Sequence, residues 1–87
     1  MQLVNIGYDN YVNAARVVSV VSPESQPVKR LIQNAKETGR VIDVTQGRKT
    51  MSVILTDSEH IILSYLKCDT LAEKFGEPDK AVPDAGE

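Results

Sequence analysis

The feature that most constrains the fold of this sequence is an alternating stretch, residues 41–55, that is interrupted by a basic turn. Two runs rich in β-branched residues flank the turn segment 45–50, whose sequence is Thr-Gln-Gly-Arg-Lys-Thr. Gly47 can adopt the positive φ that a tight turn needs. A two-residue loop at Gln46 and Gly47 therefore predicts a β-hairpin whose tip carries Arg48 and Lys49.

This loop would fix the register of the hairpin by pairing Thr45 with Arg48 and Asp43 with Thr50. Alternation then separates an apolar face from a polar face. The apolar set is Ile42, Val44, Met51, Val53 and Leu55. Such a hairpin offers one face to a core and the other to water or a partner.

Two further strands are predicted before this hairpin. Residues 2–6 form a short strand, and a cluster of turn formers, residues 7–10, closes it. Residues 11–21 form a longer strand whose apolar second half is typical of a central strand with both faces covered. Arg16 interrupts that apolar pattern, either as a side chain at the margin of the sheet or as part of a functional face.

An amphipathic helix follows the second strand. Its apolar stripe has the i, i+3, i+4, i+7 spacing of a helix that covers a sheet. Ser25 is the expected N-cap, Pro27 falls in the first turn, and Gly39 is the expected stop. The stripe consists of Val28, Leu31, Ile32 and Ala35.

A second hairpin is predicted around the turn 57–59. A three-residue loop would pair Leu55 with Ile61, which leaves Ile54 opposite Ile62 on the second face of the sheet. One helix can cover only one face of a sheet. We therefore expect Ile54 and Ile62 to lie in an interface between subunits.

The C-terminal part is predicted to be a short helix, residues 69–76, with Leu71, Ala72 and Phe75 inward, followed by an acidic disordered tail at 77–87. The expected fold is α+β: one domain, residues 1–76, with a mainly antiparallel sheet of about five strands, one amphipathic helix after the second strand and a short C-terminal helix.

Composition restricts the class of protein. The 87 residues include a single cysteine, Cys68, and contain neither a signal-peptide pattern nor an apolar run of membrane-spanning length. We expect a cytoplasmic protein without contact to a membrane. The net charge of −2 is unevenly distributed, because residues 1–56 contain seven basic and four acidic side chains, and residues 57–87 three and eight. This asymmetry can hide a polyanion site behind an acidic total, but the excess of basic residues is small, and charge alone favours an ordinary mixed-charge surface.

The sequence offers little to catalysis. It has one histidine, His60, one cysteine and no glycine-rich phosphate loop. Two such ligands do not make a zinc site. The sequence therefore favours a non-enzymatic protein with no cofactor, no metal and no small-molecule substrate.

The remaining candidate for function is a set of three cations, Arg16, Arg48 and Lys49, which could contact a phosphate backbone. Three cations on one subunit would bind DNA weakly. Repeating the site on a rigid oligomer could raise avidity by about 10²–10⁴-fold.

Several separated motifs, in order, resemble the RemA family. They are Val4-Asn5-Ile6-Gly7, Arg16, residues 21–25 with Pro27 and Lys29-Arg30, Ile42-Asp43, Gly47-Arg48, Asp57-Ser58, His60 and Ile62-Leu63-Ser64. The resemblance spans about residues 3–66. It implies a small bacterial cytoplasmic DNA-binding regulator that activates biofilm extracellular-matrix operons and takes part in osmotic-stress control. It also implies a ring-shaped homo-oligomer, an octamer.

The family's DNA-contact arginines fall on Arg16, Arg48 and the position of Lys49. Lysine keeps the charge but loses the bidentate fork of arginine. A further basic position of the family falls on Met51. The resemblance thus implies a DNA-binding regulator with a lowered affinity or an altered site preference. Two other hypotheses stay open: an oligomeric protein-interaction scaffold that does not bind nucleic acid, and an RNA-binding protein that uses the same cations.

Overall fold

The structure, a computed structural model, describes residues 1–76; the tail predicted at 77–87 lies outside the described residues. The elements, in chain order, are β1 (Leu3–Asn5), β2 (Tyr11–Asn13), a 3₁₀ turn (Ala14–Arg16), β3 (Val17–Val21), α1 (Gln26–Glu37), β4 (Val41–Asp43), β5 (Ser52–Thr56), β6 (Ile61–Ser64) and α2 (Cys68–Gly76). None of the helices in the described part is long and apolar enough to cross a membrane.

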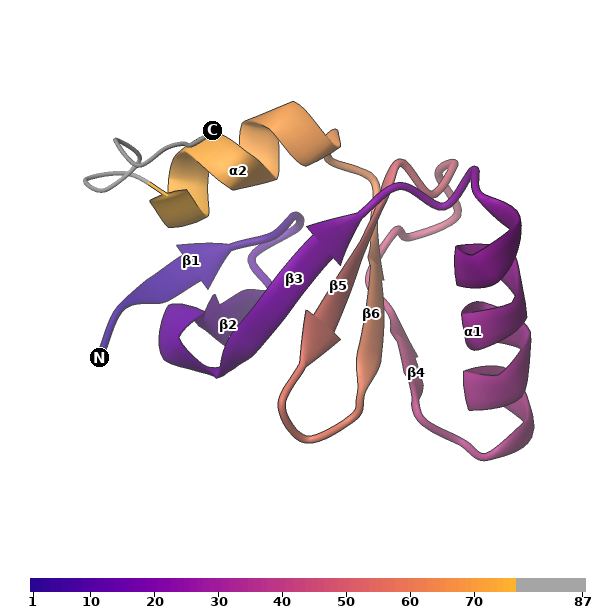
Figure 1. Cartoon of the computed structure of the whole chain (residues 1–87). Coiled ribbons are helices and arrows are strands. Elements are labelled where there is room, and N and C mark those ends of the chain that lie inside the picture. Colours follow the sequence, from indigo (N-terminus) through magenta and orange to yellow (C-terminus); the bar gives the residue numbers. More distant parts are fainter. Residues whose placement is uncertain (77–87) are drawn as a thin grey trace, which may run out of the picture.

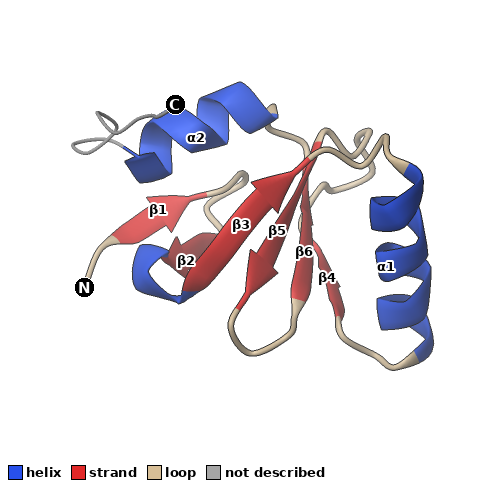
Figure 2. Cartoon of the chain, in the orientation of Figure 1, coloured by secondary structure: helices blue, strands red, loops and turns tan. Residues whose placement is uncertain are grey.

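The strands form two sheets, a four-stranded sheet in the order β3-β5-β6-β4 and a small sheet of β1 and β2. Helix α1 lies on one side of the four-stranded sheet, whereas β1, β2 and α2 lie on the other (Figures 1 and 2). Among the strands of residues 1–76, only β4 and β6 pair in parallel; the other paired strands are antiparallel. The predicted α+β class with a C-terminal helix is confirmed, with six strands instead of about five.

Alternation along β5 and β6 divides the apolar core into two clusters. Val53, Ile61 and Leu63 pack with Ala35 of α1. The intervening side chains point to the opposite side of the sheet and pack against the N-terminal strands and α2. That second cluster consists of Val4, Ile6, Ile54, Ile62 and Leu71.

Helix α1 begins and ends as the sequence predicts. The hydroxyl of Ser25 accepts a hydrogen bond from the Val28 N–H, and Pro27 lies in the first turn. At the other end Gly39 has a φ of +72°, and the Arg40 N–H donates to the Ala35 carbonyl at 2.8 Å. Local capping chemistry therefore fixes both ends of this helix.

The predicted hairpin at residues 57–59 is also confirmed. Leu55 pairs with Ile61, and Val53 pairs with Leu63. Glu59 takes a left-handed conformation, with a φ of +65°, and its N–H donates to the Thr56 carbonyl. This three-residue turn places the end of β5 beside the start of β6.

The predicted hairpin across residues 41–55 is wrong. β4 pairs with β6 in parallel, and β6 separates it from β5. All four residues of β6 are buried, so its backbone N–H and C=O groups need hydrogen-bond partners on both edges. A hairpin of residues 41–55 would leave one edge of β6 without the partner that β4 provides. Asp43 pairs with Leu63 and not with Thr50, and Ile42 is 45% exposed. The tight turn itself is present, as described below.

The long strand predicted at residues 11–21 is also wrong. The 3₁₀ turn Ala14–Arg16 breaks it, with the side chain of Asn13 accepting from the Ala15 N–H. The first half pairs with β1 in the small sheet. The second half, β3, is an edge strand with a bulge, not a central strand, and Val18 at the bulge is 66% exposed.

The second face of the sheet is covered within the chain. The N-terminal strands and α2 lie over it, which the one-helix argument did not anticipate. Ile54 is fully buried and Ile62 is 7% exposed, so both side chains lie inside the subunit. In α2, Leu71 and Phe75 face inward as predicted, but Ala72 is exposed.

Candidate nucleic-acid interface

The loop between β4 and β5 carries two of the predicted cations. The Arg48 N–H donates to the Thr45 carbonyl at 3.0 Å, and the two residues between them have positive φ values, +54° for Gln46 and +86° for Gly47. This is the tight turn that the sequence predicts. It leaves the side chains of Arg48 and Lys49 exposed.

Asp43 fixes the base of this loop. One carboxylate oxygen accepts from both the N–H and the hydroxyl of Thr45, at 2.9 and 2.7 Å. Thr45 itself is 3% exposed. The hydrogen bond from the Thr45 N–H, then the one from its hydroxyl, holds the pKa of Asp43 below its usual value, and the positive charge of Lys36 lowers it slightly further.

The Arg48 side chain rests on an aromatic ring. Its guanidinium carbon lies over the ring of Tyr65, 5.4 Å from the centroid. Tyr65 follows β6 directly. On Tyr65 packs a second ring, that of Tyr8 from the β1–β2 turn, with the two centroids 4.9 Å apart. Three segments distant in the sequence thus meet at the basic loop.

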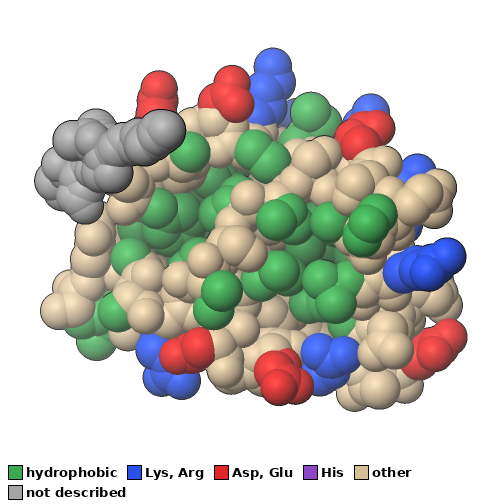
Figure 3. All heavy atoms as spheres, in the orientation of Figure 1, with side chains coloured by type: hydrophobic (Ala, Val, Ile, Leu, Met, Phe, Trp, Pro, Cys, Tyr) green, Lys and Arg blue, Asp and Glu red, His purple; other side chains and the backbone are tan. Residues whose placement is uncertain are grey.

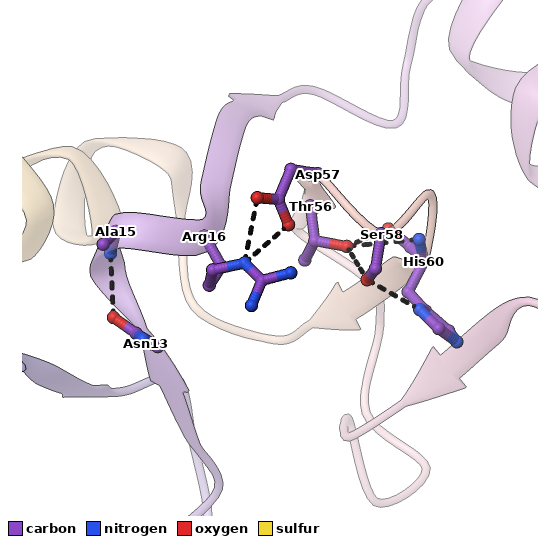
Figure 4. A network of polar contacts seen from close by, with 7 residues as sticks. All are labelled: Asn13, Ala15, Arg16, Thr56, Asp57, Ser58 and His60. Atoms are coloured by element: carbon purple, nitrogen blue, oxygen red, sulfur yellow. Dashed lines mark hydrogen bonds and ion pairs between the residues drawn. The ribbon is translucent and has the colours of Figure 1, made fainter.

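The third predicted cation, Arg16, lies just before β3 and is bound to Asp57. Its Nε donates to both carboxylate oxygens, at 2.8 and 2.9 Å, and its carbonyl accepts from the Asp57 N–H (Figure 4). Both side chains are about half exposed. Because the carboxylate engages only Nε, the two terminal amino groups of Arg16 keep their donors for another acceptor.

A separate short polar network lies beside Asp57 in the β5–β6 turn. The Ser58 hydroxyl lies 2.9 Å from both the Thr56 hydroxyl and the Nδ1 of His60 (Figure 4). His60 is exposed and lies directly before β6. Cys68 is partly buried, and this burial, followed by the charge of Asp69, raises the pKa of its thiol. Among the described residues, no three His, Cys, Asp or Glu side chains gather as metal ligands would.

Arg16 and the Arg48–Lys49 pair do not meet within one chain. Asp57 beside Arg16 follows the end of β5, whereas Arg48 and Lys49 precede its beginning. A strand rises roughly 3.3 Å per residue, so residues 51 and 57 lie about 20 Å apart along the strand. Figure 1 shows the two regions at opposite ends of the four-stranded sheet.

An apolar groove of about 400 Å³ opens between β3 and α1. Figure 3 shows apolar side chains gathered on this face, with charged side chains around them. The exposed apolar residues of the groove wall are Val18 and Leu31, at 66% and 37%. The lining consists of Val18, Leu31, Arg40, Leu55, Thr56, Glu59, His60 and Ile61. The groove therefore exposes apolar side chains to solvent, whereas Ile54 and Ile62 are buried.

Sequence reasoning missed the side chains that hold the two arginines. Tyr8 and Asp57 lie in segments that the sequence predicts only as turns, and the sequence gives Tyr65 no functional role. Asp57 contacts Arg16, Tyr65 contacts Arg48, and Tyr8 packs on Tyr65. Each contact joins residues at least 17 positions apart in the sequence, so no local pattern reveals it. Gly7 beside Tyr8 is the one local signal, because a glycine before a turn suggests a close approach of another group.

Comparison with known proteins identifies relatives along most of the chain. The family model described as RemA-like, "Extracellular matrix regulatory protein A-like", matches residues 3–75. A protein of Nitratidesulfovibrio vulgaris strain DP4 is 52% identical over 79 residues, 91% of this chain and 92% of that protein. A protein of Geobacillus thermodenitrificans strain NG80-2 is 50% identical over 80 residues, with the same two coverages. A protein of Alkaliphilus metalliredigens strain QYMF is 52% identical over 79 residues, 91% of this chain and 85% of that protein. Each carries the name "Putative regulatory protein".

Proposed function

This chain belongs to the RemA-like family, and we propose that it is a non-enzymatic regulator that binds double-stranded DNA as a homo-oligomer. The names of its relatives, which describe regulatory proteins, support this proposal. Residues 1–76 would form the DNA-binding and oligomerisation domain. The regulated genes would be of the kind that the resemblance implies, matrix and osmotic-stress operons. The protein would act in the cytoplasm without a cofactor.

The observation that carries this proposal is the presentation of the three cations. Arg16, Arg48 and Lys49 are all exposed at chain reversals, where an extended polyanion can reach them. The two arginines are also held in defined positions, one by Asp57 and the other over Tyr65. Ordered cations with free donors suit phosphate contacts, which position a protein on DNA without reading its sequence.

We infer oligomerisation because a single subunit would bind DNA weakly. Arg16 and the Arg48–Lys49 pair lie at opposite ends of the sheet, so one chain presents two small basic sites instead of one large site. Repetition around a closed ring, such as an octamer, would align equivalent sites along DNA and raise avidity. The apolar groove between β3 and α1 is the surface that we assign to contacts between copies, in place of Ile54 and Ile62.

DNA binding is tested with a fluorescently labelled duplex and measurement of anisotropy at low salt. We compare the natural chain with the double variant Arg48→Ala, Lys49→Ala, and with the control Lys29→Ala, Arg30→Ala, which removes the same charge from exposed positions of α1. The proposal expects binding that the first variant loses and the control retains. Equal loss in both, or no binding by the natural chain, would overturn it.

A protein-interaction scaffold is the second candidate, and the apolar groove is the observation that favours it. In that case Val18→Asp would abolish capture of a partner protein, while the natural chain would bind neither DNA nor RNA. For a DNA-binding oligomer, the same substitution instead reduces the mass measured by sedimentation and weakens DNA binding. An RNA duplex of the same length, used as competitor in the anisotropy assay, separates DNA binding from RNA binding.

A further inference from the structure

Arg48, Tyr65 and Tyr8 form a continuous stack at one end of the four-stranded sheet. The guanidinium of Arg48 lies over the Tyr65 ring, and the Tyr8 ring packs on Tyr65 with the two planes inclined by 39°. These residues come from the β4–β5 loop, the segment after β6 and the β1–β2 turn. The stack therefore joins the exposed cation to two other segments of the chain.

The position of Tyr65 is fixed from beneath. The buried hydroxyl of Ser64 donates to the Ile6 carbonyl at 2.8 Å, which ties the end of β6 to the end of β1. Gly7 follows with a φ of +122°, and a Cβ at this position would lie 2.8 Å from the Cε1 atom of Tyr65. Only glycine lets the ring approach the backbone this closely. Tyr65 is thus a fixed surface, unlike a side chain in a free loop.

A ring is a suitable support for an arginine that must bind phosphate. A cation–π contact holds the guanidinium electrostatically, without pairing its N–H groups with an oxygen acceptor of the protein. Within residues 1–76 the guanidinium of Arg48 donates no hydrogen bond, so its five donors can serve a phosphate. Arg16 differs, since Asp57 occupies its Nε and places a negative charge beside the site.

We propose that Tyr65 is a positioning residue for Arg48, which it holds ready for a DNA phosphate before DNA arrives. This inference rests on the proposed DNA-binding function. Immobilising a long side chain on binding is unfavourable, and an arginine already ordered by stacking loses less freedom. Removal of the Tyr65 ring should therefore weaken DNA binding by about three- to tenfold per site. This effect should depend on the presence of Arg48.

The test is a double-mutant cycle on DNA affinity, with the natural chain, Tyr65→Leu, Arg48→Ala and the combined variant. Tyr65→Leu should weaken binding in the natural background and have almost no further effect once Arg48 is alanine. Tyr65→Phe, which keeps the ring, should bind like the natural chain. Tyr11→Leu is the matched control, because Tyr11 is an exposed tyrosine of β2 outside the stack.

A second measurement reads the stack in the free protein. In the NMR spectrum the Hδ protons of Arg48 should be shifted upfield by the ring current of Tyr65, and Tyr65→Phe should preserve that shift. If Tyr65→Leu does not fold, this measurement decides, and unshifted Arg48 protons in the natural chain would overturn the proposal.

The outcomes separate this proposal from the function on which it rests. A natural chain that does not bind DNA overturns both. A natural chain that binds DNA, with Tyr65→Leu equally harmful in the presence and absence of Arg48, overturns only the positioning role. If Tyr65→Leu weakens DNA binding only when Arg48 is present, the positioning role is supported. A purely structural defect would lower the affinity with and without Arg48.

Discussion

The Nε of Arg16 lies 2.8 Å from Oδ1 of Asp57 and 2.9 Å from Oδ2, across 41 residues of sequence. This ion pair joins the start of β3 to the β5–β6 turn. Because both side chains are about half exposed, the pair contributes little to stability, about 0–1 kcal/mol for exposed pairs in general. Its main effect is to hold a cation whose terminal amino groups remain free.

Removing the charge of Asp57 should strengthen DNA binding. In Asp57→Asn the side-chain oxygen can still accept from the Arg16 Nε, but the repulsion of a nearby phosphate is lost. For charges about 7 Å apart in water this repulsion is about 0.6 kcal/mol, so affinity should rise about threefold per site. Fluorescence anisotropy measures the change, and Glu37→Gln on α1 is the control for charge alone. A weaker complex with Asp57→Asn would mean that Arg16 does not contact phosphate.

Asp43 should stabilise the basic loop through Thr45. In Asp43→Ala, the N–H and the hydroxyl of the buried Thr45 lose their acceptor, and the free energy of unfolding should fall by about 1–3 kcal/mol. Urea denaturation at pH 7 measures this difference. A variant as stable as the natural chain would show that water replaces the carboxylate at no cost.

The same carboxylate predicts a pH dependence. Its pKa is lower in the folded chain than in the unfolded chain, because hydrogen bonds from Thr45 favour the charged form. The stabilisation is therefore complete above the unfolded-state pKa of about 3.9 and is lost as the pH falls through the lower folded-state pKa. The difference in unfolding free energy between the natural chain and Asp43→Ala should shrink in acid. A difference that stays constant to pH 2 would contradict this linkage.

Two glycines with positive φ should respond differently to alanine. Gly7→Ala introduces a Cβ 2.8 Å from the Tyr65 ring as well as an unfavourable φ, whereas nothing lies within 4 Å of a Cβ at Gly47. Gly47→Ala should lower stability by about 1–2 kcal/mol, the backbone contribution alone. Gly7→Ala should lower it further. Thermal unfolding of the two variants gives the comparison, and equal melting temperatures would mean that Tyr65 moves aside freely.

Ile54 should behave as a core residue and not as an interface residue. It is fully buried between the sheet, the N-terminal strands and α2, so Ile54→Ala should lower the free energy of unfolding by about 2–5 kcal/mol. Ile42→Ala, at a 45% exposed position, is the control and should lower it by less than about 1 kcal/mol. A folded, dissociated Ile54→Ala protein of natural stability would restore the interface hypothesis.

The elements that sequence predicts well are those that local chemistry determines. Ser25, Pro27 and Gly39 define α1 through contacts within a few residues, and the three-residue turn fixes the β5–β6 register. The basic turn at Gln46–Gly47 was likewise predictable, since two successive positive φ values favour such residues. The class of the fold followed from these pieces.

The elements that sequence misplaced depend on competition between distant partners. β4 is followed in the sequence by a tight turn and by an alternating strand, β5, yet it pairs with β6. The four residues of β6 are all buried, and this strand is paired on both edges, with β5 and with β4. Local pattern cannot compare those two pairings. The same holds for the site: the exposed cations were identified, but Tyr65, Tyr8 and Asp57 reach them only through the tertiary fold.

The central claim, that the basic loop binds DNA phosphates, is tested most directly by the salt dependence of binding. The logarithm of the association constant falls with the logarithm of salt concentration by about 0.9 for each phosphate contact. We expect a steep slope for the natural chain, a slope reduced by about 1 per engaged subunit for Arg48→Ala and for Lys49→Ala, and an unchanged slope for Lys29→Ala. A slope that Arg48→Ala and Lys49→Ala leave unchanged would contradict the account.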